Sequence, residues 1–371
     1  MDFQPLAQFL NQIPSYGAPG VDCIVKQGHY TIFRHHAGFS DLKAKKPMNG
    51  TERFFLYSSS KVITCVAALQ LIERGVLALS DPLSAYFPEY AQMHVHTGTT
   101  TVLCKEQITI WHLFTMTAGF NYALDSPAIL NTRRQTNMCV PTQALARALA
   151  SQPLDFSPGS HWNYSLAHDI LGAVIEVVSG KTLGQYLTDS IFTPLEMHQT
   201  SFQRNTAPVM PQYRRDPQSG IVSEIPTENA FIFGTQYESG GAGIISTVDD
   251  YSRFAAALAN GGVGENGVVL LRPETIDLMR TNQLGPDQLN DFNWEQMVGY
   301  GYGLGVRTLL NPQVAETEAP IGEFGWSGAA GTYVLIDPSH NLSLFYAQHM
   351  LESLEPYVHP RLRNLLYTCL K

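Results

Sequence analysis

The chain has 371 residues, of which 44% are hydrophobic, and a formal net charge of −9. This length predicts about two domains, and the hydrophobic content is sufficient for a large core. The acidic balance, without a basic stripe, argues against nucleic acid as a partner. No apolar stretch reaches the ~18 residues that a membrane-spanning helix needs.

The amino-terminal residues 1–14 show no basic flank followed by an apolar run, so they do not form a signal peptide as written; a leader removed by processing is not excluded. The cysteines are Cys23, Cys65, Cys104, Cys139 and Cys369. An odd, scattered set without a C-x-x-C motif predicts reduced thiols. We therefore expect a cytoplasmic location, and the oligomeric state stays open.

The first elements predicted are a short helix over residues 1–13 and a β-hairpin formed by residues 21–26 and 30–35. The hairpin turns at Gly28. A loop over residues 38–47 leads to a long apolar run that predicts a helix buried on all sides and ending at Gly75.

Residues 85–238 have a different character, because Gly and Pro punctuate apolar helical patterns and strand-like alternation is nearly absent. The helices predicted there cover residues 110–114, 142–151, 166–179 and 183–191. This pattern is typical of a mostly helical region inserted between two halves of an α/β unit.

Strands return after residue 240. Thr247 is a good N-cap for a helix over 248–259, and Pro273 begins a helix that ends near Arg280. The remaining elements predicted are strands over 302–310, 332–336 and 342–349 and a closing helix over 360–370. Together with the hairpin, these strands predict an α/β (α+β) fold with one antiparallel sheet of about five strands. We expect a discontinuous sheet domain of residues 1–84 and 239–371, a helical domain of residues 85–238, and an active site between them.

The main candidate for chemistry is the pair Ser58 and Lys61 at the start of the buried helix. One helical turn separates them, so both side chains lie on the same face. Burial depresses the pKa of a lysine, and such an amine can take the proton of a serine hydroxyl. The alternative is that Ser58 only caps the helix while Lys61 extends to solvent. The S-x-x-K spacing is weak evidence alone, because Ser40 and Lys43 share it before a Lys-rich loop and have no predicted role.

Two further stretches offer partners for Ser58. Tyr164 precedes an apolar helix and is a candidate acid/base if a neighbouring lysine charge lowers its pKa; alone, it is more simply a half-buried tyrosine. Residues 325–331 are rich in small side chains, which let a carbonyl group approach the backbone. The backbone N–H groups of Ser58 and Ala329 are therefore candidates for an oxyanion hole, although a tight entry into a strand would explain the glycines equally well.

Two other motifs give weaker evidence of function. The glycine cluster 240–243 lacks the lysine of a P-loop and the spacing of a dinucleotide fingerprint. The histidines His35, His36, His94 and His96 lack nearby ligands to complete a metal site, so we predict surface histidines, no metal and no cofactor.

Three motifs in order resemble the serine β-lactamase and penicillin-binding-protein superfamily, in its class C-like branch. They are Ser58-x-x-Lys61, Tyr164-Ser165-Leu166 and Trp326-Ser327-Gly328. Supporting stretches are Asp81-Pro82, residues 109–119, Gly240-Gly241, Gly331 and Asp337-Pro338. The resemblance covers about residues 18–350. It implies a β-lactamase/transpeptidase-like fold and a Ser-Lys-Tyr serine hydrolase.

The departures from the family pattern limit the range of substrates that we expect. β-Lactamases and peptidases of the family usually carry Tyr-x-Asn and Lys-Thr-Gly, whereas this chain has Leu166 and Trp326 in place of the amide and the cation. The motifs are closer to the family's esterase and acyltransferase members, including the class VIII esterases. We expect Leu166, Trp326, Ser327 and Gly328 to contact an uncharged ester or acyl substrate.

The leading hypothesis is a carboxylesterase that forms an acyl-enzyme at Ser58 with the help of Lys61 and Tyr164. A β-lactamase, a D-amino-acid peptidase or an acyltransferase is the alternative within the same class of enzymes. A third reading makes Ser327 the nucleophile of an α/β-hydrolase elbow, which requires strand, turn and helix. A catalytically silent binding relative is the alternative from another class.

Overall fold

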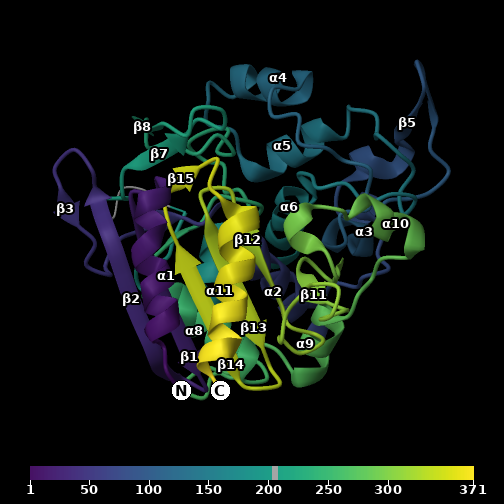
Figure 1. Ribbon diagram of the computed structural model, residues 1–371. Helices are drawn as coiled ribbons and strands as arrows, with labels where there is room; N and C mark the ends of the chain where they lie inside the picture. The colour runs from purple at the N-terminus through teal and green to yellow at the C-terminus, as the bar shows by residue number, and fades with distance from the viewer. Residues whose placement is uncertain (203–207) are drawn as a thin grey trace.

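The computed structural model describes residues 1–202 and 208–371 (Figure 1). In this part of the chain the largest sheet has eight strands in the order β10-β11-β12-β13-β14-β1-β2-β3. Every neighbouring pair is antiparallel, and the amino-terminal β1 lies between β2 and the carboxy-terminal β14. The antiparallel sheet and the flanking helices confirm the predicted fold class.

The strands of this sheet are β1 (Gly20–Gln27), β2 (Tyr30–Asp41), β3 (Lys46–Pro47), β10 (Tyr300–Tyr302), β11 (Arg307–Leu309), β12 (Phe324–Gly328), β13 (Thr332–Asp337) and β14 (Leu342–Ala347). The shorter strands are β4 (Phe54–Phe55), β5 (His94–Thr97), β6 (Thr100–Leu103), β7 (Gln212–Arg215), β8 (Val222–Ile225), β9 (Ile245–Ser246) and β15 (Met350–Leu351). The helices are α1 (Gln4–Gln12), α2 (Ser60–Glu73), α3 (Ile110–Phe114), α4 (Pro127–Gln135), α5 (Thr142–Leu149), α6 (Ala167–Ser179), α7 (Leu183–Leu187), α8 (Val248–Ala259), α9 (Pro273–Arg280), α10 (Pro286–Asp291) and α11 (Glu355–Cys369).

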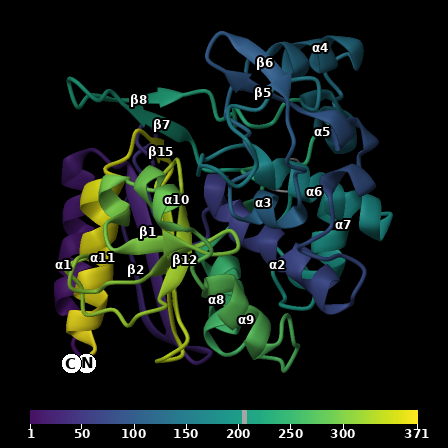
Figure 2. The same ribbon diagram turned by 90° about the vertical axis from the view of Figure 1, so that its right-hand side faces the viewer.

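Helices cover both faces of the large sheet. The helices α1 and α11 pack side by side on one face, and α8 packs on the other against β1, β13 and β14 (Figure 1). Beyond α8, the helices α3, α5 and α6 form a second layer, and α2 lies between that layer and the sheet (Figure 2). The position of α2 follows from its sequence, because residues 60–71 are all buried and apolar residues occupy nearly every face. The predicted domain boundaries stay a prediction.

Several predicted elements are confirmed with small changes at their ends. Thr247 caps α8 by accepting a hydrogen bond from the Asp250 amide at 3.1 Å, and α9 covers Pro273–Arg280 as predicted. The helix α6 ends at Gly180, whose φ of 68° closes the helix in the left-handed conformation.

The prediction of about five strands is too low. The run 302–310 is a tight hairpin, β10 and β11, because Gly305 at φ +85° reverses the chain where a continuous strand was expected. Residues 324–328 form a strand of their own, and β2 extends through Asp41 to pair with β3 in the segment predicted as a loop.

Other elements were missed. The helix α4 was not predicted, nor were the short strands β5 to β8 inside the helical region or β15 beyond it. The closing helix α11 begins at Glu355 rather than at Pro360, because proline is tolerated here inside the helix instead of marking its first turn. No helix among the described residues is long and apolar enough to span a bilayer.

A buried ionic network fastens α11 to the edge of the sheet. The Arg307 guanidinium on β11 donates to Glu323 at 2.9 Å, and the Tyr300 hydroxyl donates to the same carboxylate at 2.6 Å. Arg363 on α11 donates to the Tyr300 oxygen at 2.9 Å. Arg307 and Glu323 are almost fully buried, so each charge depends on the other for its solvation.

Removing the charge of Glu323 tests this network. Glu323→Gln is expected to lower the free energy of unfolding by about 3 kcal/mol, because it leaves the buried Arg307 charge without its counter-ion. Urea denaturation measures the change. Asp189→Asn, in an exposed ion pair with Lys181, is the control and is expected to cost less than about 1 kcal/mol. Equal effects of the two substitutions would contradict the assignment.

Candidate active site

Ser58 stands in a short 3₁₀ turn, Tyr57–Ser59, that runs directly into α2. Its side chain is half-buried, whereas its neighbours Tyr57 and Ser59 are buried. Tyr57 has a φ of 47°, which is rare for a residue with a Cβ and costs free energy unless the surroundings impose it. Backbone strain of this kind directly before an accessible hydroxyl marks a candidate functional site.

Lys61 is 0% exposed and makes three hydrogen bonds from its ammonium group. Nζ donates to the Ser58 hydroxyl at 3.2 Å, to the Tyr122 hydroxyl at 2.7 Å and to the Gly241 carbonyl at 2.8 Å. Burial disfavours the charged form and lowers the pKa of Lys61 to about 7, against an opposing field from Asp169. A fraction of the molecules therefore holds a neutral amine beside Ser58 at neutral pH. The prediction that the first turn of the buried helix joins these two side chains agrees with this geometry.

Asp169 supplies a buried negative charge behind Lys61 and was not predicted. It lies in the first turn of α6, where its carboxylate accepts from Ser239 at 2.6 Å and from Tyr237 at 2.9 Å. Burial raises the pKa of Asp169, while the Lys61 charge opposes that shift. The one signal in the sequence was an acidic residue in the first turn of an otherwise apolar helix. An acid buried at such a place needs hydrogen-bond or ionic partners, so the pattern indicates a polar cluster.

Tyr164 approaches Ser58 from the loop before α6. The Lys61 ammonium lies 4.6 Å from the centre of the Tyr164 ring, and the Trp326 indole donates to the phenol oxygen at 2.9 Å. The condition set for Tyr164, a pKa lowered by a neighbouring lysine charge, is not met. Burial raises that pKa, and it outweighs the hydrogen bonds with Ser58 and Trp326 that act in the opposite direction. The phenol therefore keeps its proton at neutral pH.

Tyr122 is a second phenol at the site, and no motif spacing in the chain identifies it. It lies in the loop between α3 and α4, and its ring centre is 5.3 Å from that of Tyr164. Burial raises the pKa of Tyr122 well above its usual range. The two phenols and Lys61 thus form one polar cluster at Ser58.

The turn between β12 and β13, which contains Ala329, lies against the segment that carries Ser58. The Thr332 hydroxyl donates to the Leu56 carbonyl at 3.0 Å and shares a 2.8 Å hydrogen bond with the Ser59 hydroxyl. A side chain at Gly328 would overlap the Leu56 carbonyl oxygen, so glycine permits this close approach. Ala329 is exposed at the turn between β12 and β13, and its role as an oxyanion donor with Ser58 stays a prediction.

The other residues predicted to contact substrate are placed differently. Trp326 is 1% exposed and acts on Tyr164 through its indole. Leu166 is 3% exposed and lines a small cavity beside Phe120 and Leu149, which does not support a contact with substrate. Ser327 is followed by the antiparallel strand β13 rather than by a helix, so the geometry of an α/β-hydrolase elbow is absent at this place.

The histidines considered as metal ligands and the second S-x-x-K pair lie on the strands β2 and β5 and the turn after β2. His94 and His96 are exposed on β5, and His35 bonds Asn11 at 2.9 Å. The Ser40 hydroxyl donates to the Lys46 carbonyl at 3.3 Å within the β2–β3 turn. All five cysteines are free thiols.

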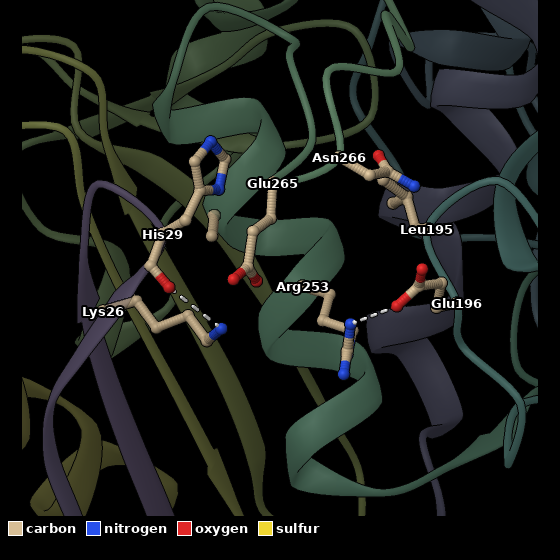
Figure 3. Close-up of a pocket in the computed structure, with 8 residues that line it drawn as sticks. Lys26, His29, Leu195, Glu196, Arg253, Glu265 and Asn266 are labelled. Carbon is tan, nitrogen blue, oxygen red and sulfur yellow. Dashed lines mark hydrogen bonds and ion pairs between the residues drawn. The ribbon is translucent and has the colours of Figure 1, made fainter.

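An open groove of about 820 Å³ begins beside the cluster at Tyr57 and Tyr122. Apolar side chains on its walls include Phe231, Ile232 and Leu351. A different cavity of about 320 Å³ lies where α8 faces the β1–β2 turn. It is lined by charged groups, including the Arg253–Glu196 ion pair (Figure 3), and none of its lining residues is a serine, cysteine or tyrosine. The groove, not this cavity, is therefore the candidate substrate site.

Comparison with known proteins agrees with the fold. The Beta-lactamase family profile matches residues 4–365. Esterase EstB of Burkholderia gladioli is 30% identical, over 88% of this chain and 84% of that protein. Lovastatin esterase of Penicillium rubens is 29% identical, over 85% of this chain and 84% of that protein. The solved structure of EstCE1, a hydrolase with promiscuous acyltransferase activity, superposes with a TM-score of 0.80 at 26% identity and covers 97% of both chains.

The chain therefore belongs to the Beta-lactamase family, which has esterases and acyltransferases among its members. The resemblance stated from the ordered motifs is confirmed.

The close packing at Gly241 generates a prediction. A Cβ there would overlap the Asp169 carboxylate and lie 3.3 Å from Lys61 Nζ, so Gly241→Ala is expected to displace the amine from Ser58. Loss of alignment of this size costs about 10²-fold in rate. Hydrolysis of p-nitrophenyl butyrate measures it.

Gly285→Ala is the matched control, because the nearest atom to its added Cβ is 3.8 Å away, and its activity is expected to stay within about twofold of wild type. Full activity of Gly241→Ala in a folded protein would show that the position of Lys61 does not matter for the reaction.

Proposed function

We propose that the protein is a carboxylesterase that forms an acyl-enzyme at Ser58. The observation that carries this proposal is the buried Lys61 amine, hydrogen-bonded to an accessible serine hydroxyl at 3.2 Å and with a pKa of about 7. An amine of this pKa is matched to proton transfer at neutral pH. The esterase relatives support the reaction type.

In the first half-reaction, neutral Lys61 takes the proton of the Ser58 hydroxyl, and the oxygen attacks the ester carbonyl carbon. The negative charge that forms on the carbonyl oxygen is held by the backbone N–H groups of Ser58 and Ala329. The ester C–O bond then breaks, and Tyr164 donates its proton to the leaving alkoxide. The proton that Lys61 took from Ser58 then passes to the Tyr164 oxygen, so both Lys61 and Tyr164 are neutral again.

In the second half-reaction, a water molecule attacks the acyl carbonyl. Lys61 accepts a proton from the water and passes it to Ser58 Oγ as the bond between that oxygen and the acyl carbon breaks, which releases the carboxylic acid and returns Lys61 to its neutral form. Tyr164 serves as an acid in this scheme because burial keeps its phenol protonated. Tyr122 holds Lys61 in place through their 2.7 Å hydrogen bond.

The substrate we propose is an uncharged acyl ester. No lysine stands in the place of Trp326, so the cation that the resemblance associates with carboxylate-bearing substrates is missing. The groove of about 820 Å³ with Phe231 and Ile232 on its walls leaves room for an apolar portion larger than a short acyl chain. A dominant rate on nitrocefin, compared with short esters, would favour a β-lactamase instead.

Acyl transfer is a second candidate, because the groove is open to solvent and can admit an alcohol in place of water. EstCE1, with which the chain shares 26% identity, is described as a hydrolase with acyltransferase activity. Formation of a new ester from p-nitrophenyl butyrate and an added alcohol distinguishes transfer from hydrolysis.

Replacement of the nucleophile is the direct test. Ser58→Ala is expected to lower kcat on p-nitrophenyl acetate and butyrate by about 10⁴-fold or more, as for nucleophile deletions in other serine hydrolases. Ser40→Ala is the control, because Ser40 has the same S-x-x-K spacing and a buried structural hydroxyl. Mass mapping after fluorophosphonate treatment is expected to find the label on Ser58. An active Ser58→Ala protein, or wild type that takes no label, would refute the proposal and favour a binding role.

The pH dependence follows from the lowered pKa of Lys61. Below about pH 7 the amine is protonated and cannot accept the serine proton, so kcat/KM on a neutral ester is expected to fall about tenfold per pH unit. Above pH 7 it is expected to level off because the amine is neutral, and to stay level because the phenol of Tyr164 keeps its proton.

The ascending limb is expected to stay at the same pH in Glu355→Gln, although that carboxyl also has a pKa of about 7. A limb that moves or vanishes in this variant would assign the titration to Glu355 instead of Lys61.

A further inference from the structure

One aromatic ring on the wall of the groove also contacts the residues around the nucleophile. The ring centre of Phe231 lies 5.4 Å from that of Tyr122 and 6.2 Å from that of Tyr57, in edge-to-face contacts. Tyr57 directly precedes Ser58, and the Tyr122 hydroxyl accepts a hydrogen bond from Lys61. All three rings line the groove of about 820 Å³. Phe231 therefore forms the wall of this groove at the end nearest to the nucleophile.

A second apolar side chain of the groove lies beside the turn that contains the proposed oxyanion donor. Leu351 on β15 lines the groove, and it packs together with Phe231 against a buried cluster that includes Ala330. The Met350 amide donates to the Ala330 carbonyl at 3.1 Å and holds β15 against this turn. Because Ala330 directly follows Ala329, the apolar end of the groove adjoins the proposed place of the substrate carbonyl oxygen.

Hydrogen bonds fix the loop that carries Phe231. Asn229 is buried, and its side-chain amide donates to the Ala242 carbonyl at 2.7 Å. Its side-chain oxygen accepts from the Phe231 amide at 3.0 Å. Ala242 directly follows Gly241, whose carbonyl accepts from Lys61 at 2.8 Å. The same stretch of backbone thus holds both the wall of the groove and the buried amine.

The charges on the lining of the groove fit an uncharged occupant. Among the described residues that line it, the charged ones are Asp125, Arg133, Arg214 and Glu228, two of each sign. A lining with balanced charge does not select for an anion or a cation. Selection in this groove therefore depends on apolar contact and shape.

The proposed reaction decides which portion of an ester enters the groove. Tyr164 is the proposed acid for the leaving alkoxide, so the alcohol portion lies on the Tyr164 side of the site. Neither Tyr164 nor its partner Trp326 is among the described residues that line the groove, whereas Tyr57 beside the nucleophile is. The groove is therefore on the side of the acyl portion.

We propose that the groove is the acyl subsite and that Phe231 is a specificity-determining residue, which makes the site favour unbranched acyl chains longer than butanoyl. An alkyl chain that lies along Phe231 and Leu351 leaves water, and its transfer is favourable in proportion to the apolar area buried. Asn229 is a positioning residue, because it acts through Phe231. This inference rests on the proposed esterase function and names the acyl class for the same site.

Two series of esters test the assignment in wild type. At a constant p-nitrophenyl leaving group, kcat/KM is expected to be about tenfold higher on the octanoate than on the butyrate, because the longer chain buries more apolar area. Octyl acetate and butyl acetate are expected to react within about twofold of each other, because the alcohol portion lies outside the groove. A dependence on the length of the alcohol as steep as that on the acyl chain would overturn the proposal.

Replacement of the ring tests the role of Phe231. In Phe231→Ala the octanoate-to-butyrate ratio, measured within that variant, is expected to fall to about twofold, because the wall beside the first carbons of the chain is lost. Phe231→Leu keeps an apolar wall and is expected to retain most of the wild-type ratio. Phe39→Ala is the matched control, because Phe39 is exposed on β2 and does not line the groove. Its ratio is expected to equal that of wild type.

A purely structural role of Phe231 gives a different result. If the ring only held Tyr57 and Tyr122 in place, its removal would lower both rates by a common factor and leave the ratio at its wild-type value, which would overturn the role of Phe231.

The wild-type measurement keeps the test decisive even if neither Phe231 variant folds. Equal Ser58-dependent rates on the butyrate and the octanoate would refute the acyl subsite and leave the esterase function intact. Rates that persist in Ser58→Ala would instead refute the esterase function itself.

Discussion

The burial of one ammonium group is the constraint on which the site depends. Lys61 lies in the first turn of a helix that is enclosed on all sides, so its charge has lost the stabilisation of water. The protein compensates with a carbonyl, two hydroxyls and the field of Asp169, but only in part, and the pKa of the amine therefore falls to the neutral range. The hydroxyls of Ser58 and Tyr122 both accept from that amine, and the Tyr164 ring lies beside it.

Sequence reasoning identified the parts that local chemistry determines. Ser58 and Lys61 could be paired because one helical turn sets their separation, and the apolar run after them predicted the burial of α2. Tyr122 and Asp169 could not be found in this way, because their positions depend on how the α3–α4 loop and α6 pack against α2. The same limit applies to the sheet: the pattern of β1 and β14 predicted strands, whereas the hairpin at Gly305 and the β2–β3 pairing depend on backbone conformation that hydrophobic alternation does not encode.

The Ser58 cluster and the carboxy-terminal helix α11 are supported by different contacts. The amine and its neighbours are held by the packing of α2 and α6. The helix α11 is fixed to the edge of the sheet by the Arg363–Tyr300–Glu323 hydrogen bonds. The contacts that hold α11 are therefore separate from those that position Lys61 beside Ser58.

The short edge strand β3 of the large sheet affects whether two copies of the chain can pair through their sheets. It is only two residues long, and Lys46 and Pro47 supply a charge and a position without an amide hydrogen. A border of this kind is a poor template for a strand from another copy of the chain, because the ladder cannot continue along it. The protein thereby limits self-association along an edge that would otherwise invite aggregation.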